Sequence, residues 1–198
     1  PPLTPSTPVH PTTSMAELPR SPDVTREVMG YLVVTDGARL AQQLSPDQPN
    51  ADPHKIQAAL LAQLGIAPDL AATIDLSRPL GVALLNPALL ATASVQPYVA
   101  MVPVRSQQAV EDVMTAHNTP FTRTPWGFQT PTGKAKMSVA FVPGYAVVAW
   151  RDDLLQATVK LLAPRLQHKA DAPVVVHLDF ENVHEAFGPQ IERLLTNV

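Results

Sequence analysis

One pattern constrains the fold of this chain more than any other, and it recurs four times after residue 22. A short apolar run with the alternation of a β-strand gives way, at a polar residue, to the spacing of an amphipathic helix. The four stretches are 31–44, 98–114, 145–162 and 173–195. The pattern predicts repeated strand-turn-helix units.

Three further segments lie between these units. Residues 54–65 predict a helix that ends at Gly65, since glycine accepts the left-handed backbone of a helix end. Residues 78–87 predict a buried strand. The pair Pro143-Gly144 predicts a tight turn between two strands, because Pro fixes the first central angle and Gly permits the second.

Polar residues bear on how the sheet is covered. They interrupt the predicted strands at Arg123, Lys134, Lys136 and His177. Strands covered by helices on both faces are uniformly apolar, so one face of this sheet is expected to meet solvent. We therefore predict an α+β fold, with a mostly antiparallel or mixed sheet and amphipathic helices packed on one face.

The first 22 residues differ in composition from the rest. They hold seven of the 22 prolines of the chain, together with Ser and Thr, and have too little apolar surface to fold. We interpret residues 1–22 as an extended tether, either to a membrane anchor or to another domain. Residues 23–198 are expected to form a single α+β domain.

Composition excludes several classes of function. With 198 residues, a net charge of −3 and no Lys/Arg cluster, the chain lacks the basic surface that nucleic acid or anionic lipid requires. It has no cysteine, which excludes disulfides, thiolate metal sites and thiol nucleophiles. No apolar run reaches the roughly 18–20 residues that span a bilayer.

Asp152 and Asp153 form an acidic pair where a strand meets a helix. Two carboxylates there would suit acid/base chemistry, but the unpaired N–H groups and positive dipole end of a helix start also favour them. Asp36 and Ser106 occupy the equivalent place in two other units. A capping role predicts this recurrence and a unique active site does not, so we predict a helix start.

The residues that most resemble a metal site are His177, Asp179, Glu181 and His184. Glu181 and His184 have the Glu-x-x-His spacing of carboxylate-bridged metal sites, which require that motif twice. It occurs once here, so a polar strand edge followed by a charged helix start is the expected structure. On that strand, Val176 and Leu178 are expected on the opposite, apolar face.

Trp126 and Phe128 lie in a proline-flanked segment. If exposed, these rings would anchor a partner, because aromatic side chains bring a large contact area at small entropic cost; the alternative is that they cap the core. With His177 and Asp179 they are our candidate partner contacts. No catalytic, metal or cofactor-binding residue is predicted, and the motifs of serine nucleophiles, zincins, phosphate loops and dinucleotide turns are absent.

Four stretches carry a resemblance to a known family. They are "IDLSRPLGVALLNP" (74–87), "YVAMVPVRSQQAVEDVM" (98–114), "GYAVVAWRDDLLQATVKLL" (144–162) and "PVVVHLDFENVHEAFGPQIERLL" (173–195). Over about residues 25–198 the chain resembles uncharacterised bacterial cell-envelope domains, often predicted lipoproteins. The resemblance implies a periplasmic or outer-membrane-anchored protein, longer than this chain, with any membrane anchor upstream of Pro1. It implies no functional residues.

The leading hypothesis from the sequence is a non-enzymatic envelope domain that acts as a scaffold or protein-binding module. It would present an open sheet face or sheet edge to a protein partner or to a second copy of itself. The alternative is a metal-dependent enzyme or metal-binding domain that uses His177, Asp179, Glu181 and His184.

Overall fold

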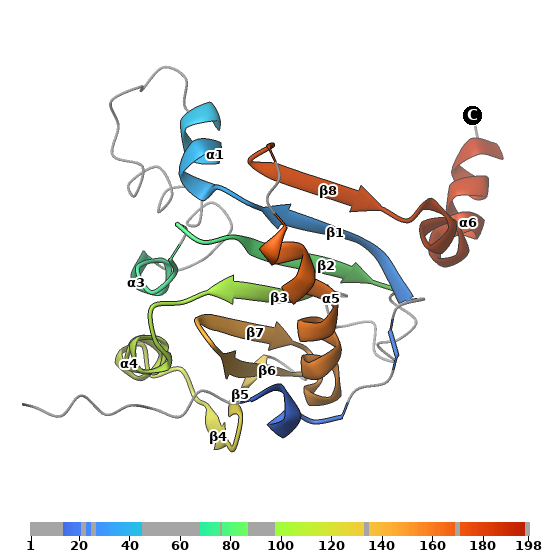
Figure 1. Cartoon of the computed structure of the whole chain (residues 1–198). Coiled ribbons are helices and arrows are strands. Elements are labelled where there is room, and N and C mark those ends of the chain that lie inside the picture. The colour runs from blue at the N-terminus through green and yellow to red at the C-terminus, as the bar shows by residue number, and fades with distance from the viewer. Residues whose placement is uncertain are drawn as a thin grey trace, which may run out of the picture.

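In the part of the chain that the structure describes, eight strands form one sheet in which every neighbouring pair is antiparallel (Figure 1). In spatial order they are β4 (Thr122–Thr124), β5 (Gly127–Thr132), β6 (Ala135–Val142), β7 (Tyr145–Ala149), β3 (Tyr98–Pro103), β2 (Leu80–Leu85), β1 (Val28–Val34) and β8 (Val174–Leu178). The structure is a computed structural model that describes residues 14–20, 23–24, 27–44, 68–75, 77–86, 98–132, 135–168 and 171–196. The helix predicted over 54–65 and the first 13 residues lie outside these ranges. The predicted α+β class is confirmed, with an antiparallel sheet.

Two local predictions for the strands are confirmed, the first in part. Residues 78–87 contain β2, which lies between β3 and β1 inside the sheet, but the strand is buried on one face only, because Leu84 is 40% exposed. Pro143 and Gly144 join β6 to β7, and Gly144 has a φ of 74°, a left-handed value that glycine adopts without strain. The hairpin therefore forms where the sequence places its turn.

Helices follow several strands directly. Beside the short α3 (Pro68–Ala71), they are α1 (Gly37–Leu44), α4 (Gln107–Ala116), α5 (Leu155–Gln167) and α6 (Phe180–Thr196). Asp36, Ser106 and Asp179 accept hydrogen bonds from N–H groups in the first turns of α1, α4 and α6, at 2.8, 3.1 and 3.1 Å. These side chains satisfy backbone donors that the helix itself leaves unpaired. The capping role predicted for Asp36 and Ser106 is confirmed.

The acidic pair begins a helix as well. Asp152 and Asp153 open the 3-10 turn η4 (Asp152–Leu154), which continues into α5. Asp153 accepts a hydrogen bond of 2.9 Å from Nε of Arg151, and this bond raises the pKa of the guanidinium. Asp152 accepts from the backbone N–H of Asp153 at 2.9 Å. Both carboxylates are thus engaged at the helix start.

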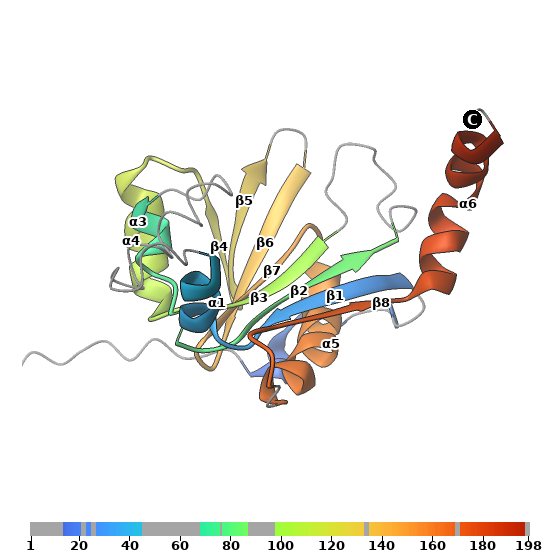
Figure 2. The same ribbon diagram turned by 90° about the horizontal axis from the view of Figure 1, so that it is seen from above.

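Helices cover both faces of the sheet, in different places. On one face the buried side of α5 packs over the middle strands, in a core that includes Ala83, Val99, Met101, Val147, Leu155 and Leu162. On the other, Val110 of α4 packs with Phe128, Val139, Phe141 and Ala146. Ala146 and Val147 are adjacent in β7 and belong to different cores, so the two helices lie on opposite faces (Figure 2). The expectation that all helices pack on one face is therefore wrong for α4.

Part of the predicted tether belongs to the folded body. Ser14 and Glu17 form a capping box around the 3-10 turn η1 (Met15–Glu17), with the N–H of Ser14 donating to Oε2 of Glu17 at 2.6 Å. Leu18 is buried in the core beneath α5. The packed part of the chain therefore includes residues before 23.

Candidate functional site

The aromatic pair predicted as a partner contact is buried. Trp126 is 7% exposed and Phe128 1% exposed. The Phe128 ring lies 5.3 Å from that of Phe121 and 5.8 Å from that of Phe141, which are contact distances for aromatic pairs in a core. The alternative, that these rings complete the core, describes their position. Neither ring is available to a partner in this structure.

The polar residues of the last unit do not converge on one point. His177 is exposed and its ring stacks on Tyr31, with the centroids 4.9 Å apart. Asp179 caps α6, while Glu181 and His184 are exposed on that helix. Among the residues that the structure describes, which include these four, no group of three or more His, Asp or Glu is arranged to hold a metal.

β8 is the last strand of the sheet, and its outer side is open among the described strands. Asp179 donates its N–H to the carbonyl of Met29, and Thr35 donates to the carbonyl of Pro173. With the β1–β8 register, these two bonds mean that the odd-numbered residues of β8 direct their backbone N–H and C=O groups toward β1. The N–H and C=O groups of Val174, Val176 and Leu178 therefore point outward, away from the sheet.

The same strand exposes large apolar side chains. Val176 is 60% exposed and Leu178 50%, and Phe180, just beyond the strand, is 76% exposed. On the same face, Leu32 (36% exposed) lies beside Val176, and Leu84 (40%) lies across Gly30 from Leu178. We call Val176, Leu178 and Phe180, with the outward backbone of β8, the β8 edge surface. The sequence predicted that Val176 and Leu178 share an apolar face of the strand, and in the structure this face is exposed at both residues.

The β8 edge surface lacks the devices that usually protect an edge strand. Natural edges carry Lys, inward-pointing charges, bulges or Pro within the strand. β8 reads VVVHL and carries no Asp, Glu, Lys, Arg or Pro. Apolar patches of a few hundred Å² on a soluble protein commonly mark interaction sites. The arrangement suits the addition of an extended strand, which uses backbone hydrogen bonds along an open edge.

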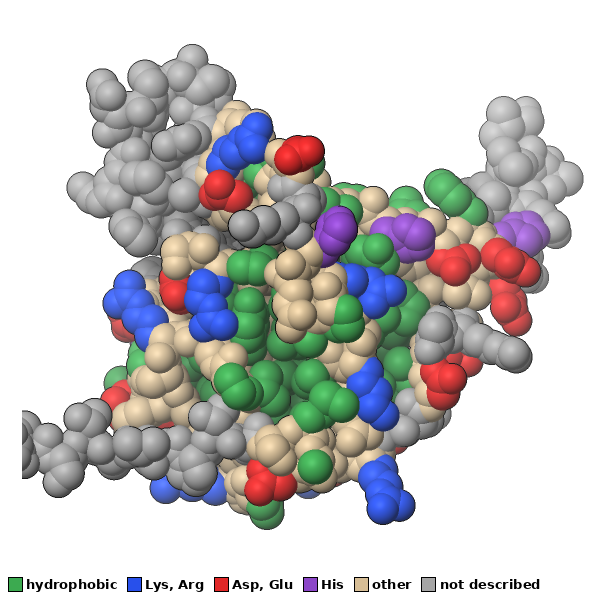
Figure 3. All heavy atoms as spheres, viewed as in Figure 1, with side chains coloured by type: hydrophobic (Ala, Val, Ile, Leu, Met, Phe, Trp, Pro, Cys, Tyr) green, Lys and Arg blue, Asp and Glu red, His purple; other side chains and the backbone are tan. Residues whose placement is uncertain are grey.

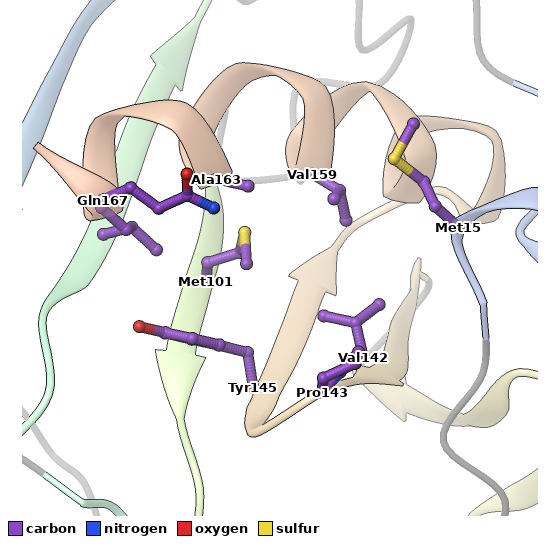
Figure 4. Close-up of a pocket in the computed structure, with 9 residues that line it drawn as sticks. Met15, Met101, Val142, Pro143, Tyr145, Val159, Ala163 and Gln167 are labelled. Atoms are coloured by element: carbon purple, nitrogen blue, oxygen red, sulfur yellow. The ribbon is translucent and has the colours of Figure 1, made fainter.

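Two hollows lie beside α5. Figure 3 shows hydrophobic side chains gathered in the middle of the face that carries α5, with charged residues and histidines around them. A cavity of about 260 Å³ lies between the sheet and α5, where Met101 and Tyr145 extend toward Val159 and Ala163 (Figure 4). Its remaining lining residues are Met15, Val142, Pro143, Leu166 and Gln167. None of these described lining residues carries a carboxylate, imidazole or amine, so this cavity suits apolar groups.

A second hollow of about 370 Å³ lies beside the C-terminal half of α5. The guanidinium of Arg165 sits 4.5 Å from the centroid of the Tyr31 ring. Thr35 and His168 also line this hollow. The Thr35 hydroxyl donates to the carbonyl of Ala172 at 2.6 Å, so it helps to hold the start of β8 in place.

Two polar clusters elsewhere serve the fold. The Ser77 hydroxyl donates to Asp75 at 2.6 Å and lowers the pKa of that carboxyl, an effect to which Arg78 and Arg105 add. Asp75 is therefore held in its charged form. The buried Glu111 accepts hydrogen bonds from Arg123 at 2.6 Å and from Gln107 at 2.7 Å, so its charge is matched within the fold.

Sequence reasoning missed Val176, Leu178 and Phe180 as a surface. The run of three valines in "VVVHL" is apolar at consecutive positions, which is typical of a strand buried on both faces. Only the strand order shows that β8 has one neighbour. Because β8 has one neighbouring strand, apolar side chains that its sequence pattern would place in a core are left exposed.

Within the described part of the chain, no helix has the length and hydropathy needed to cross a membrane. Comparisons with protein-family models, with curated proteins and with solved structures found no match to this chain.

Proposed function

We propose that this chain is a non-enzymatic scaffold or protein-binding module of the bacterial cell envelope, and that it binds a protein partner at the β8 edge surface. One observation carries the proposal. β8 combines an unpaired row of backbone N–H and C=O groups with exposed apolar side chains on one face. When a strand is added to a sheet edge, the backbone groups provide affinity and the side chains provide specificity.

Other features support a binding role. α6 follows β8 directly and projects past the end of the sheet (Figure 2), so it borders the same surface. Phe180, the first residue of α6, is 76% exposed, and aromatic side chains are frequent anchors of protein interfaces. The repetition of strand-turn-helix units and the resemblance to envelope domains remain predictions from the sequence, and the Pro-rich start of the chain is consistent with an envelope tether.

Site-specific photo-cross-linking tests the proposal. A photoreactive amino acid at position 176 is compared with one at position 160, where Lys160 is also exposed but lies on α5. Both variants are irradiated in extracts of cells that produce the chain. We expect adducts of defined mass from position 176 and none from position 160, because only the first lies on the β8 edge surface.

A second variant controls for chance contacts. Val176→Pro in a chain that carries the photoreactive group at position 178 removes an outward N–H and should abolish the adduct. The proposal fails if position 176 gives no adduct, if position 160 gives the same bands, or if the proline leaves the adduct at full yield.

A further inference from the structure

We infer that the strand that fits the β8 edge surface is β8 of a second copy of this chain, so that two sheets join into one across a twofold axis. The inference rests on the proposed function, because it names the occupant of that surface. Its starting point is that Val174, Val176 and Leu178 are evenly spaced about Val176 and all direct their backbone groups outward.

This spacing makes the edge self-complementary. In an antiparallel pair centred on Val176, Val176 lies opposite itself, and Val174 lies opposite Leu178 of the second copy. The twofold adds the pair of Leu178 with Val174 of the second copy, which makes three pairs. Each pair exchanges two bonds, an N–H to a C=O in each direction, so the pairing forms six backbone hydrogen bonds and leaves no outward group of the strand unmatched.

Charge and side-chain chemistry are compatible with self-pairing. β8 has no Asp, Glu, Lys or Arg, so two copies meet without like-charge repulsion along the strand. The apolar side chains of both copies fall on the same face of the joined sheet, because residues opposite one another in an antiparallel pair share a face. Val176 of one copy thus lies beside Val176 of the other, and Leu178 of each copy lies beside Val174 of the other.

The other end of the sheet does not offer an equivalent partner. β4 is the opposite edge, and it has three residues, Thr122–Thr124. Its central residue, Arg123, is ion-paired with Glu111. Pairing of β8 with β4 of another copy would also be head-to-tail, which gives a ring of several copies or an open filament, whereas pairing of β8 with β8 closes with two copies as a twofold dimer.

The surface available sets the strength of the dimer. At 50–76% exposure, Val176, Leu178 and Phe180 offer on the order of 300 Å² of apolar surface per copy. Thr35, just after β1, lies opposite Pro173, so α1 lies beside the start of β8. The twofold axis therefore places α6 of each copy beside α1 of the other copy. Standard interfaces bury about 800 Å² per partner, so we expect a weak, reversible dimer with a dissociation constant on the order of 10–100 µM.

Sedimentation of the purified full chain, from about 1 to 500 µM, measures the association directly. We expect a reversible monomer–dimer equilibrium for the wild type. Val176→Pro should weaken it at least about tenfold with an unchanged far-UV spectrum, because the N–H of Val176 is outside the β1–β8 ladder and proline is tolerated at such edge positions. Leu84→Lys, on the same face but two strands from the edge, should still dimerise.

Cysteine cross-linking tests the register without disturbing the strand. The chain has no cysteine, so single substitutions give unambiguous products. In the proposed pairing the two copies of position 176 are about 5.5 Å apart, whereas the two copies of position 174 are about 14 Å apart, four residues along the strand. A short dimaleimide whose reach lies between these spacings should link Val176→Cys into dimers, and Val174→Cys should stay monomeric.

The outcomes separate this inference from the proposed function. The inference that a second copy pairs with β8 is overturned if the wild-type chain is monomeric at every concentration, or if positions 174 and 176 cross-link equally. If Leu84→Lys abolishes the dimer and Val176→Pro does not, the copies associate through the sheet face and the inference is wrong. If the chain is monomeric but position 176 cross-links to a different protein, the inference falls and the proposed function stands.

Discussion

Removing one side chain beneath α5 tests whether the packing of this helix stabilises the sheet. Leu162 is 0% exposed, and a methyl group on Gly81 would lie 3.3 Å from Cδ2 of Leu162 and 3.2 Å from Cδ2 of Leu166. The absence of a side chain at Gly81 therefore lets α5 approach β2 closely. Leu162→Ala removes three carbons from this contact.

The magnitude follows from burial and cavity terms. Three carbons at about 0.8 kcal/mol each give about 2.4 kcal/mol of lost transfer free energy. A residual cavity on the order of 70 Å³, at about 24 cal/mol per Å³, adds about 1.7 kcal/mol. We expect Leu162→Ala to lower the free energy of unfolding by about 4 kcal/mol, a large part of the roughly 5–15 kcal/mol typical of a folded domain.

Urea denaturation followed by circular dichroism measures this loss, and Leu84→Ala is the matched control. Leu84 is 40% exposed and faces away from α5, so removing the same three carbons should cost about 1.4 kcal/mol. Gly81→Ala provides a double-mutant cycle, since its methyl group crowds Leu162 in the wild type and finds space in Leu162→Ala. The packing argument is refuted if both leucine variants lose equal stability or if the cycle shows no coupling.

Three further predictions concern single contacts. Hydrogen bonding by Ser77 lowers the pKa of Asp75, so the charged carboxylate stabilises the folded state above its unfolded pKa of about 4. This stabilisation is lost as pH falls through the lower folded pKa. Asp75→Asn should therefore reduce the drop in melting temperature between pH 7 and pH 3. Ser106→Ala should cost about 1 kcal/mol in urea denaturation through its lost cap. Gly30→Ala places a methyl group 2.6 Å from the His177 carbonyl oxygen, and should destabilise by about 1–3 kcal/mol and speed hydrogen exchange in β8.

Features set by neighbouring residues were predictable from the sequence. Asp36 and Ser106 cap helices that begin one residue later, because a short polar side chain reaches the N–H groups of the first turn whatever the rest of the fold does. The turn at Pro143 and Gly144 is equally local. The strand order is not a local feature. β8 pairs with β1, so Val33 lies opposite Val175 although more than half of the chain separates them in sequence.

The candidate site was predictable only in part, for the same reason. An aromatic ring in a proline-flanked segment has the same local pattern whether it is buried or exposed. Burial of Trp126 and Phe128 depends on the partners that the sheet brings to them, such as Phe141. Exposure of Val176 depends on the absence of a strand beyond β8 among the described residues. The sequence thus predicted a strand with one polar and one apolar face, but its pattern does not show whether the apolar face is covered.

An edge strand binds well only if it is already held in the bound conformation, since ordering it during association would weaken binding. β8 is held from the face opposite to the β8 edge surface. The His177 ring stacks on Tyr31, the Thr35 hydroxyl bonds the carbonyl of Ala172, and the Arg39 guanidinium bonds that of Asp171 at 2.8 Å. These contacts use side chains and carbonyls that point away from the open edge. The strand is therefore fixed on one side while its outward backbone groups and apolar side chains remain free to bind, which is why the edge, rather than the hollows beside α5, is the surface best prepared for a partner.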